Sequence, residues 1–232
     1  MFAFNHDADV ELVRIGRCGL EVSVMHDVLH DPHGVAALGL EQAYGADPGN
    51  LYPGVRAAMP ENFSVALHAW LTPILQRNGM LERNQVIVRD TSFFSVVTTA
   101  SSDLLPIQRI PHYDSTDPTL LAAVIYLCGP EFGGTAFYRH RRTGYEEITA
   151  QNVGNYQLAL NSDMRIHGPP PRHYMNGDSV LFETIFSNDS KFNGAIVYPA
   201  RILHAAKIDK QFSPPQQRSD WRLTITALLR AG

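Results

Sequence analysis

The sequence predicts a mainly β protein of the α+β class, in which a β-sandwich or barrel is backed by a helical layer near the N-terminus. Two observations lead to this prediction. From residue 84 onward, short runs rich in β-branched and aromatic residues follow one another between turn residues. Before them, residues 61–77 carry one apolar stripe at helical spacing, which is typical of a helix packed against a sheet.

Composition favours one globular domain over residues 1–232, in which a supporting part, 1–84, precedes a core, 85–230. Of the 232 residues, 44% are hydrophobic and 18% charged, and the net charge is −4 without a basic run. This balance argues against nucleic acid and membranes as partners. The sequence shows no signal peptide and no membrane span, and Cys18 and Cys128 lie far apart, so we expect reduced thiols in a cytoplasmic protein. A homodimer is compatible with the sequence.

The N-terminal elements follow from local signals. Alternating apolar residues over 10–28 predict a hairpin that turns near Gly16–Gly19. Asp31 before Pro32 predicts the start of a helix that ends at Gly45. Residues 45–60 are interpreted as a surface loop with a solvated arginine, Arg56, although its Tyr-Pro-Gly-Val-Arg motif leaves open that the loop reaches an active site.

The second half of the chain is predicted to consist of short strands, with one insertion between them. Residues 144–176 break the pattern and are interpreted as an insertion that contains a helix over 146–160. The predicted strands are residues 85–88, 93–99, 105–111, 120–128, 134–138, 179–186, 194–198, 202–206 and 220–229.

The most informative pair of residues for function is His112 and Asp114, which are separated by one residue. On a β-strand, side chains two residues apart point to the same face, so this imidazole and this carboxylate would project side by side. They would supply two of the three ligands of a site made of two histidines and one carboxylate, which leaves positions open on Fe(II). The pair alone is weak, because a core histidine beside a turn aspartate gives the same pattern.

Five short motifs occur in a fixed order along residues 85–230. They are Pro111-His112-Tyr113-Asp114, Ile125-Tyr126-Leu127, Gly133-Gly134-Thr135-Ala136-Phe137, Leu203-His204-Ala205 and Arg222-Leu223-Thr224-Ile225-Thr226. Together they resemble the catalytic core of the Fe(II)/2-oxoglutarate-dependent dioxygenases, in particular the prolyl-hydroxylase-like branch. The N-terminal part resembles an uncharacterised bacterial group with this core. The resemblance implies a double-stranded β-helix, the cupin-like jelly-roll barrel, backed by helices.

The resemblance also implies the metal ligands and the cosubstrate site. His112, Asp114 and His204 would bind Fe(II). Arg222 would bind the far carboxylate of 2-oxoglutarate, because a guanidinium stays charged and donates two parallel hydrogen bonds. Thr226 and Tyr126 would contact the same carboxylate.

Some positions have alternatives. Arg218 is the second candidate for the role of Arg222, whose distance from His204 along the chain exceeds that usual in the family. Other histidines in or beside the predicted insertion are alternative metal ligands for which a solvated role is expected: His140, His167 and His173. Residues expected on the substrate side of the site are Arg56, Phe94, Tyr138 and Arg139.

The implied function is hydroxylation of an unactivated C–H bond of a small molecule, amino acid or peptide, with O2 and 2-oxoglutarate consumed and succinate and CO2 released. Desaturation and ring formation would need only a different substrate pose. The alternatives are a cupin-like metalloprotein, either a non-oxoglutarate dioxygenase or an isomerase, and a catalytically silent ligand-binding barrel. A dicarboxylate anchor made by Arg222 with Thr226 distinguishes an oxygenase from the cupin-like alternative, which has no use for one, and the complete triad argues against the silent barrel.

Overall fold

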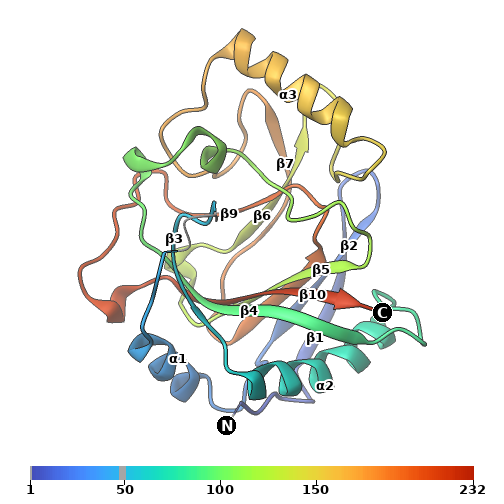
Figure 1. The fold of residues 1–232 in the computed structure, drawn as a ribbon, viewed down its shortest axis with the longest axis vertical. Helices are drawn as coiled ribbons and strands as arrows, with labels where there is room; N and C mark the ends of the chain where they lie inside the picture. Colours follow the sequence, from blue (N-terminus) through green and yellow to red (C-terminus); the bar gives the residue numbers. More distant parts are fainter. Residues whose placement is uncertain (1, 47–50) are drawn as a thin grey trace.

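The structure is a computed structural model that describes residues 2–46 and 51–232. Among these residues, two antiparallel sheets face each other (Figure 1). The larger sheet has the order β1-β2-β8-β5-β10-β4-β3 and the smaller one the order β7-β6-β9. The strands are β1 (Asp9–Ile15), β2 (Leu20–His26), β3 (Gly54–Ala58), β4 (Ile87–Val97), β5 (Leu120–Tyr126), β6 (Thr135–His140), β7 (Phe182–Asn188), β8 (Gly194–Pro199), β9 (His204–Ala206) and β10 (Leu223–Ala231).

The strand order is that of a jelly roll, which confirms the predicted fold class. Strands β4, β10, β5 and β8 form the central part of the larger sheet. They face β7, β6 and β9, and a fourth segment extends the smaller sheet where His112 pairs with His204 in β9. From β4 onward the chain therefore crosses from one sheet to the other at each step, except at the β6–β7 hairpin within the smaller sheet. The β1–β2 hairpin widens the larger sheet beside β8.

Helices cover the outer faces of both sheets. Helices α1 (Pro32–Glu41) and α2 (Glu61–Asn78) lie at the opposite end of the molecule from α3 (Val153–His167) (Figure 1). Helix α2 buries one apolar stripe against the larger sheet and ends at Gly79, whose left-handed backbone (φ 86°) closes it. No helix in the described part of the chain is long and apolar enough to cross a membrane.

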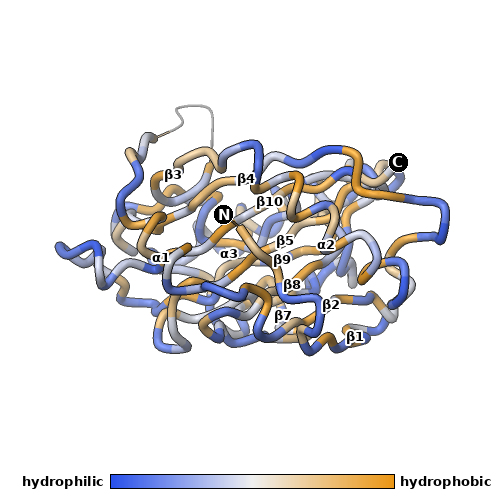
Figure 2. Tube along the Cα trace, turned by 90° about the horizontal axis from the view of Figure 1, so that it is seen from below, coloured by the Kyte–Doolittle hydropathy of each residue, from blue (hydrophilic) through white to orange (hydrophobic). Residues whose placement is uncertain are grey.

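The alternation of side chains along each strand separates three apolar layers. In β4 and β10, Phe94 and Ile225 point to the α2 side and join the core beneath that helix. A second cluster fills part of the space between the sheets and includes Tyr126, Phe137 and Tyr198. A third lies between the smaller sheet and α3. Figure 2 shows the apolar residues gathered along the strands, with hydrophilic segments at the outer turns.

Two N-terminal predictions need correction. Helix α1 ends at Glu41 rather than Gly45, because Gly45 instead pairs with Arg56. The predicted loop 45–60 contains strand β3, which extends the larger sheet along β4 and so satisfies its backbone groups on that side. Residues 47–50 of that loop lie outside the described residues.

Three later boundaries also differ. The two strands predicted over 85–99 are one continuous strand, β4. Residues 105–111 are not a strand: Pro106 begins a short 3-10 helix that ends at Arg109. Helix α3 begins at Val153 rather than 146, because residues 146–148 run extended along the segment that precedes β9, with the amide of Ile148 donating to the carbonyl of Arg201 at 2.8 Å.

Candidate metal centre

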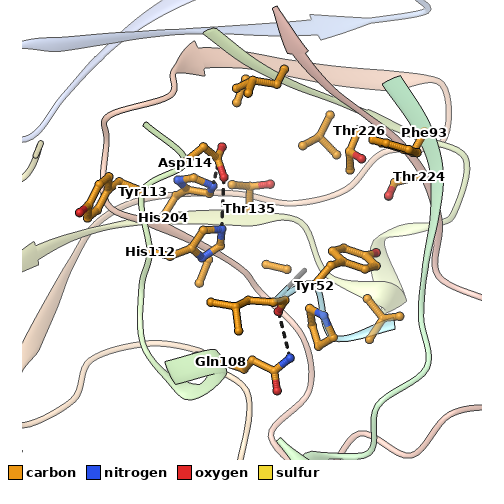
Figure 3. Close-up of a pocket in the computed structure, with 18 of the residues that line it drawn as sticks. Tyr52, Phe93, Gln108, His112, Tyr113, Asp114, Thr135, His204, Thr224 and Thr226 are labelled. Carbon is orange, nitrogen blue, oxygen red and sulfur yellow. Dashed lines mark hydrogen bonds and ion pairs between the residues drawn. The ribbon is translucent and has the colours of Figure 1, made fainter. Parts of the chain in front are cut away.

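Backbone pairing brings His112, Asp114 and His204 to one place between the sheets (Figure 3). The amide of His112 donates to the carbonyl of His204 at 2.9 Å, and the amide of His204 donates back at 2.8 Å. The amide of Asp114 donates to the carbonyl of Ala200 at 2.8 Å. As a result, one potential ligand atom from each of the three side chains lies within 4.8 Å of the other two.

The ring nitrogens are oriented for binding a cation. Nδ1 of His204 lies 2.8 Å from the carbonyl oxygen of Ile202, which can only accept, so Nδ1 carries the proton. Its Nε2 is then a lone-pair donor and lies 3.6 Å from Oδ2 of Asp114. Nε2 of His112 lies 3.7 Å from Oδ1 of the same carboxylate. Desolvation, followed by repulsion from His204, lowers the pKa of His112 to about 4, so its imidazole is neutral at pH 7 and able to ligate.

The three side chains face a cavity of about 700 Å³. Its polar wall includes Arg222, Thr224 and Thr226 from the β10 segment and Thr135 from β6 (Figure 3). The remaining wall is mostly apolar or aromatic and comes from both sheets and from the 105–113 segment, with Phe93, Val97, Ile107, Ile110, Tyr113, Tyr174, Met175 and Tyr198 among the lining residues. The arrangement joins a three-ligand metal site to a space large enough for small organic molecules.

Arg222 lies just before β10 and is held in place by the double glycine. Its Nε donates to the carbonyl of Phe132 at 3.0 Å, and its Nη2 donates to that of Gly134 at 3.1 Å. At Gly133 the backbone has φ 69°, and a Cβ would lie 1.6 Å from the carbonyl oxygen of Lys207, so only glycine fits. The glycine turn therefore places the carbonyls that fix this buried guanidinium at the cavity wall.

A row of polar side chains crosses the larger sheet beside Arg222. In register, Arg56 of β3 pairs with Ser95 of β4, Ser95 with Thr224 of β10, and Thr224 with Tyr126 of β5. Directly paired residues share a face of the sheet, so all four side chains point between the two sheets. The Tyr126 hydroxyl lies 2.7 Å from that of Thr135.

Thr224 is the residue that sequence reasoning missed. The argument that placed Thr226 on the Arg222 face, a spacing of four along a strand, holds equally for a spacing of two. Both threonines line the cavity. The alternation along β10 was therefore sufficient to find Thr224.

The structure places three of the expected substrate-side residues away from the cavity. Phe94 points to the helix side of β4, and its neighbour Phe93 lines the cavity instead. Tyr138 belongs to the cluster under α3, because its neighbour Phe137 faces the space between the sheets and side chains alternate along β6. Arg139 is buried and pairs with Glu146 and Glu183. Arg56, in contrast, lines the cavity.

The alternative ligands and the alternative anchor also lie elsewhere. Nε2 of His140 is 3.0 Å from Asp163 rather than near the triad, so this histidine is buried beside that carboxylate and not solvated as expected. His167 is exposed at the end of α3, and His173 bonds the carbonyl of its neighbour Tyr174. Arg218 is exposed and stacks on Trp221, 5.0 Å from the ring centre.

A family model matches residues 6–229. The chain belongs to the DUF6445 family, described as a family of unknown function. The sequence of this DUF6445 protein matches no curated protein. Neither finding assigns a function to this chain.

Several solved structures are similar to this DUF6445 protein at low sequence identity. A prolyl-4-hydroxylase from Pseudomonas putida has 11% identity and a TM-score of 0.49 over 92% of this chain and 94% of that one. The non-heme alpha-ketoglutarate-dependent epimerase SnoN of nogalamycin biosynthesis has 12% identity and a TM-score of 0.49, over 90% and 78%. The non-heme alpha-ketoglutarate-dependent carbocyclase SnoK of the same biosynthesis has 14% sequence identity and a TM-score of 0.48, over 90% of this chain and 79% of that one.

Proposed function

We propose that this protein is an Fe(II)- and 2-oxoglutarate-dependent oxygenase that hydroxylates a C–H bond of a small molecule, amino acid or peptide and releases succinate and CO2. The observation that carries the proposal is the position of Arg222 in the same cavity as His112, Asp114 and His204. The metal held by the three ligands would bind the 2-oxo acid end of 2-oxoglutarate, and the fixed guanidinium would bind the carboxylate at its other end.

The ligand set fits Fe(II). Two imidazoles with available Nε2 atoms and one carboxylate form the 2-His-1-carboxylate set. A structural zinc site would need a fourth protein ligand, and within residues 2–46 and 51–232 no other histidine, cysteine or acidic side chain joins this group. The side of the ion that faces the cavity would therefore stay open to the cosubstrate and O2.

The bound metal would supply the activation of O2 that is coupled to decarboxylation of the cosubstrate. The chain's own residues bind and orient. His204 is held in one tautomer by Ile202, and Arg222 is held at the wall by the 132–134 carbonyls. Thr224 can donate its hydroxyl to the carboxylate that Arg222 binds, and Tyr126 supports Thr135 nearby. The apolar wall excludes water, which strengthens each of these polar interactions.

The test is an anaerobic titration of the Fe(II)-loaded protein with 2-oxoglutarate, followed by the visible metal-to-ligand charge-transfer band. We expect the band in the wild-type protein, its loss in His204→Ala, and a shift to ~10- to 100-fold higher 2-oxoglutarate concentration in Arg222→Met, because a charge-assisted bidentate contact is lost. Arg218→Met is the matched control, since that guanidinium lies outside the cavity.

Iron binding without a charge-transfer band would contradict the proposal and favour a cupin-like metalloprotein. If Arg218→Met weakened 2-oxoglutarate binding as strongly as Arg222→Met, Arg222 would lose its assigned role.

A further inference from the structure

The inner face of the larger sheet is uncovered along part of β4 and β10. On β10, Thr224 is buried, whereas Thr226 and Leu228, which follow it on the same face, are only partly buried. On β4, Phe93 is partly buried and Thr91 is exposed. All five side chains line the cavity. The cavity therefore opens to solvent toward the Thr91 and Leu228 ends of these two strands.

The uncovered side chains form one continuous apolar surface. In register, Phe93 pairs with Thr226 and Thr91 pairs with Leu228, so Phe93 and Leu228 are diagonal neighbours on adjacent strands. Val124 of β5, which is partly buried and lines the cavity, pairs with Thr226 on its other side. We call Phe93, Val124 and Leu228 the apolar platform. An apolar surface that stays open inside a cavity is typical of a ligand-binding site.

The metal triad lies near the open end of the apolar platform. The amide of Asp114 donates to the carbonyl of Ala200 at 2.8 Å, and the amide of Ala200 donates to the carbonyl of Leu120 at 2.9 Å. Leu120 in turn pairs with Arg230 of β10, two residues beyond Leu228. The chain of contacts thus connects Asp114 to the end of β10 at which Leu228 is uncovered.

Arg222 lies at the opposite end of the same strand. Leu228 follows Arg222 by six positions, which corresponds to roughly 20 Å along an extended strand. This is longer than 2-oxoglutarate together with the arginine side chain, so a cosubstrate anchored at Arg222 would lie nearer Thr224 and leave Leu228 uncovered. Figure 3 shows Phe93 and Thr226 across the cavity from the three ligand side chains.

We propose that the primary substrate lies on the apolar platform and is a small organic molecule with an apolar ring or chain beside the reacting carbon. This inference rests on the proposed function and narrows its substrate class. Contact with Phe93, Val124 and Leu228 removes apolar area of both partners from water, which favours binding. A polar compound would lose hydration there, with the hydroxyls of Thr91 and Thr226 at the border of the platform to replace it.

The experiment uses the full protein loaded with Fe(II) and 2-oxoglutarate under anaerobic conditions, with the charge-transfer band recorded first. The apolar probes are indole, 2-naphthol and cyclohexylmethanol, and the polar probes are L-threonine and glycerol. Calorimetric titration measures their binding. We expect at least one apolar probe to bind ~10-fold or more tightly than either polar probe, because it buries apolar area on the platform.

Two substitutions of Leu228 test whether the apolar probe lies on the platform. Leu228→Ser should weaken its binding by ~10-fold, and Leu228→Ile, which keeps the apolar surface, by less than roughly threefold. Leu158→Ser is the matched control, because that leucine is 72% exposed on α3 and lies outside the cavity. It should leave the affinity unchanged. Retained binding by Leu228→Ile also shows that the site is folded.

Proton relaxation of the bound probe tests its distance from the triad. Mn(II) in place of Fe(II) is paramagnetic and speeds the relaxation of protons close to it. The relaxation rate of the apolar probe should therefore rise in the Mn(II)-loaded protein and fall back in His204→Ala, in which a metal ligand is missing. Binding to an apolar patch elsewhere on the surface would not give this difference.

Four outcomes would overturn the inference. The wild-type protein with a full charge-transfer band could bind the apolar probes no better than the polar ones, which leaves the proposed function standing. Leu228→Ser and Leu158→Ser could affect the apolar probe equally, which would place it elsewhere. Leu228→Ser could raise the 2-oxoglutarate requirement as much as Arg222→Met, which would make the platform part of the cosubstrate site. The absence of any charge-transfer band would overturn the proposed function and the substrate class with it.

Discussion

The hydroxyl oxygens of Ser95 and Thr226 lie 2.7 Å apart and share a hydrogen bond between neighbouring strands. Thr224, two residues earlier on the same face, makes only a longer contact of 3.3 Å to the main-chain carbonyl of Ser95. Thr226 is therefore the more firmly engaged of the two hydroxyls, and Thr224 is the nearer in sequence to Arg222.

This difference predicts which threonine contacts the cosubstrate. We expect Thr224→Val to raise the 2-oxoglutarate concentration needed for half of the charge-transfer band by ~10-fold, because a hydrogen bond to a charged group is lost. Thr226→Val, a matched change on the same strand, should raise it by less than roughly threefold. The reverse order would return the role to Thr226, as the sequence alone indicated.

The metal site can be tested independently of any cosubstrate. His204→Ala and Asp114→Ala should each weaken binding of Co(II), a stable substitute for Fe(II), by ~100-fold or more. Each variant leaves only two of the three protein ligands to hold the ion. His167→Ala is the control, because that histidine is exposed on α3. Calorimetric titration measures the affinities. An affinity lowered equally by His167→Ala would place the metal elsewhere.

Two adjacent glutamates predict very different effects on stability. The carboxylate of Glu146 is buried, bonds Arg139 at 2.8 Å, and accepts from the amides of Arg17 and Cys18 at 2.9 and 3.1 Å. Glu146→Ala removes the buried partner of Arg139, which keeps only Glu183, and leaves two backbone amides without their acceptor, so it should lower the free energy of unfolding by about 3–5 kcal/mol in urea denaturation.

Glu147 is the matched control for that change. It pairs with Arg201 at 2.5 Å, but both side chains are more than a quarter exposed. Glu147→Ala should therefore cost about 1 kcal/mol or less. Equal losses for the two variants would show that burial does not determine the strength of these pairs.

The lowered pKa of His112 predicts a pH dependence of the metal-free protein. Its pKa is about 4 in the folded state against about 6.5 in an unfolded chain, so the unfolded state binds the proton first as pH falls. The contribution of His112 to stability is complete above pH ~6.5 and is lost between there and pH ~4.

Urea denaturation at pH 7.0, 5.5 and 4.5 would measure this effect. The free energy of unfolding of the wild-type protein should fall faster over this range than that of His112→Gln, which cannot titrate there. Parallel curves for the two proteins would contradict the prediction. The comparison isolates His112 because the other histidines, His140 included, are present in both proteins.

The sequence was most informative where local periodicity and long-range packing agree. Helix α2 was predicted to within a residue, since its apolar stripe, its Gly79 cap and its burial on the sheet all favour the same element. The buried run of β5 was likewise clear. The motifs predicted that His112, Asp114 and His204 lie together, as they do in the structure, although His112 lies in an isolated bridge rather than on a long strand.

The sequence was least informative where pairing partners decide the outcome. Nothing local distinguishes residues 54–58 from a loop, because their strand exists only through β4. Phe93 and Phe94 are neighbours of the same residue type, so the sequence does not say which of them faces the cavity. That depends on which face of β4 each side chain occupies. The phase of β6 likewise decides that Phe137 faces the space between the sheets and its neighbour Tyr138 faces α3. Such phases depend on register, which a single sequence does not specify.

The edge position of β3 has a consequence for how this protein could be redesigned. The pairing of His112 with His204 belongs to the smaller sheet, whereas Arg56 lies on a strand at the border of the larger sheet, which pairs with β4 on one side and with Gly45 on the other. Substitutions at Tyr52 and Arg56 would therefore alter one wall of the cavity without moving the triad. Selection, in nature or in the laboratory, could change what is bound at that wall while the arrangement of His112, Asp114 and His204 stays the same.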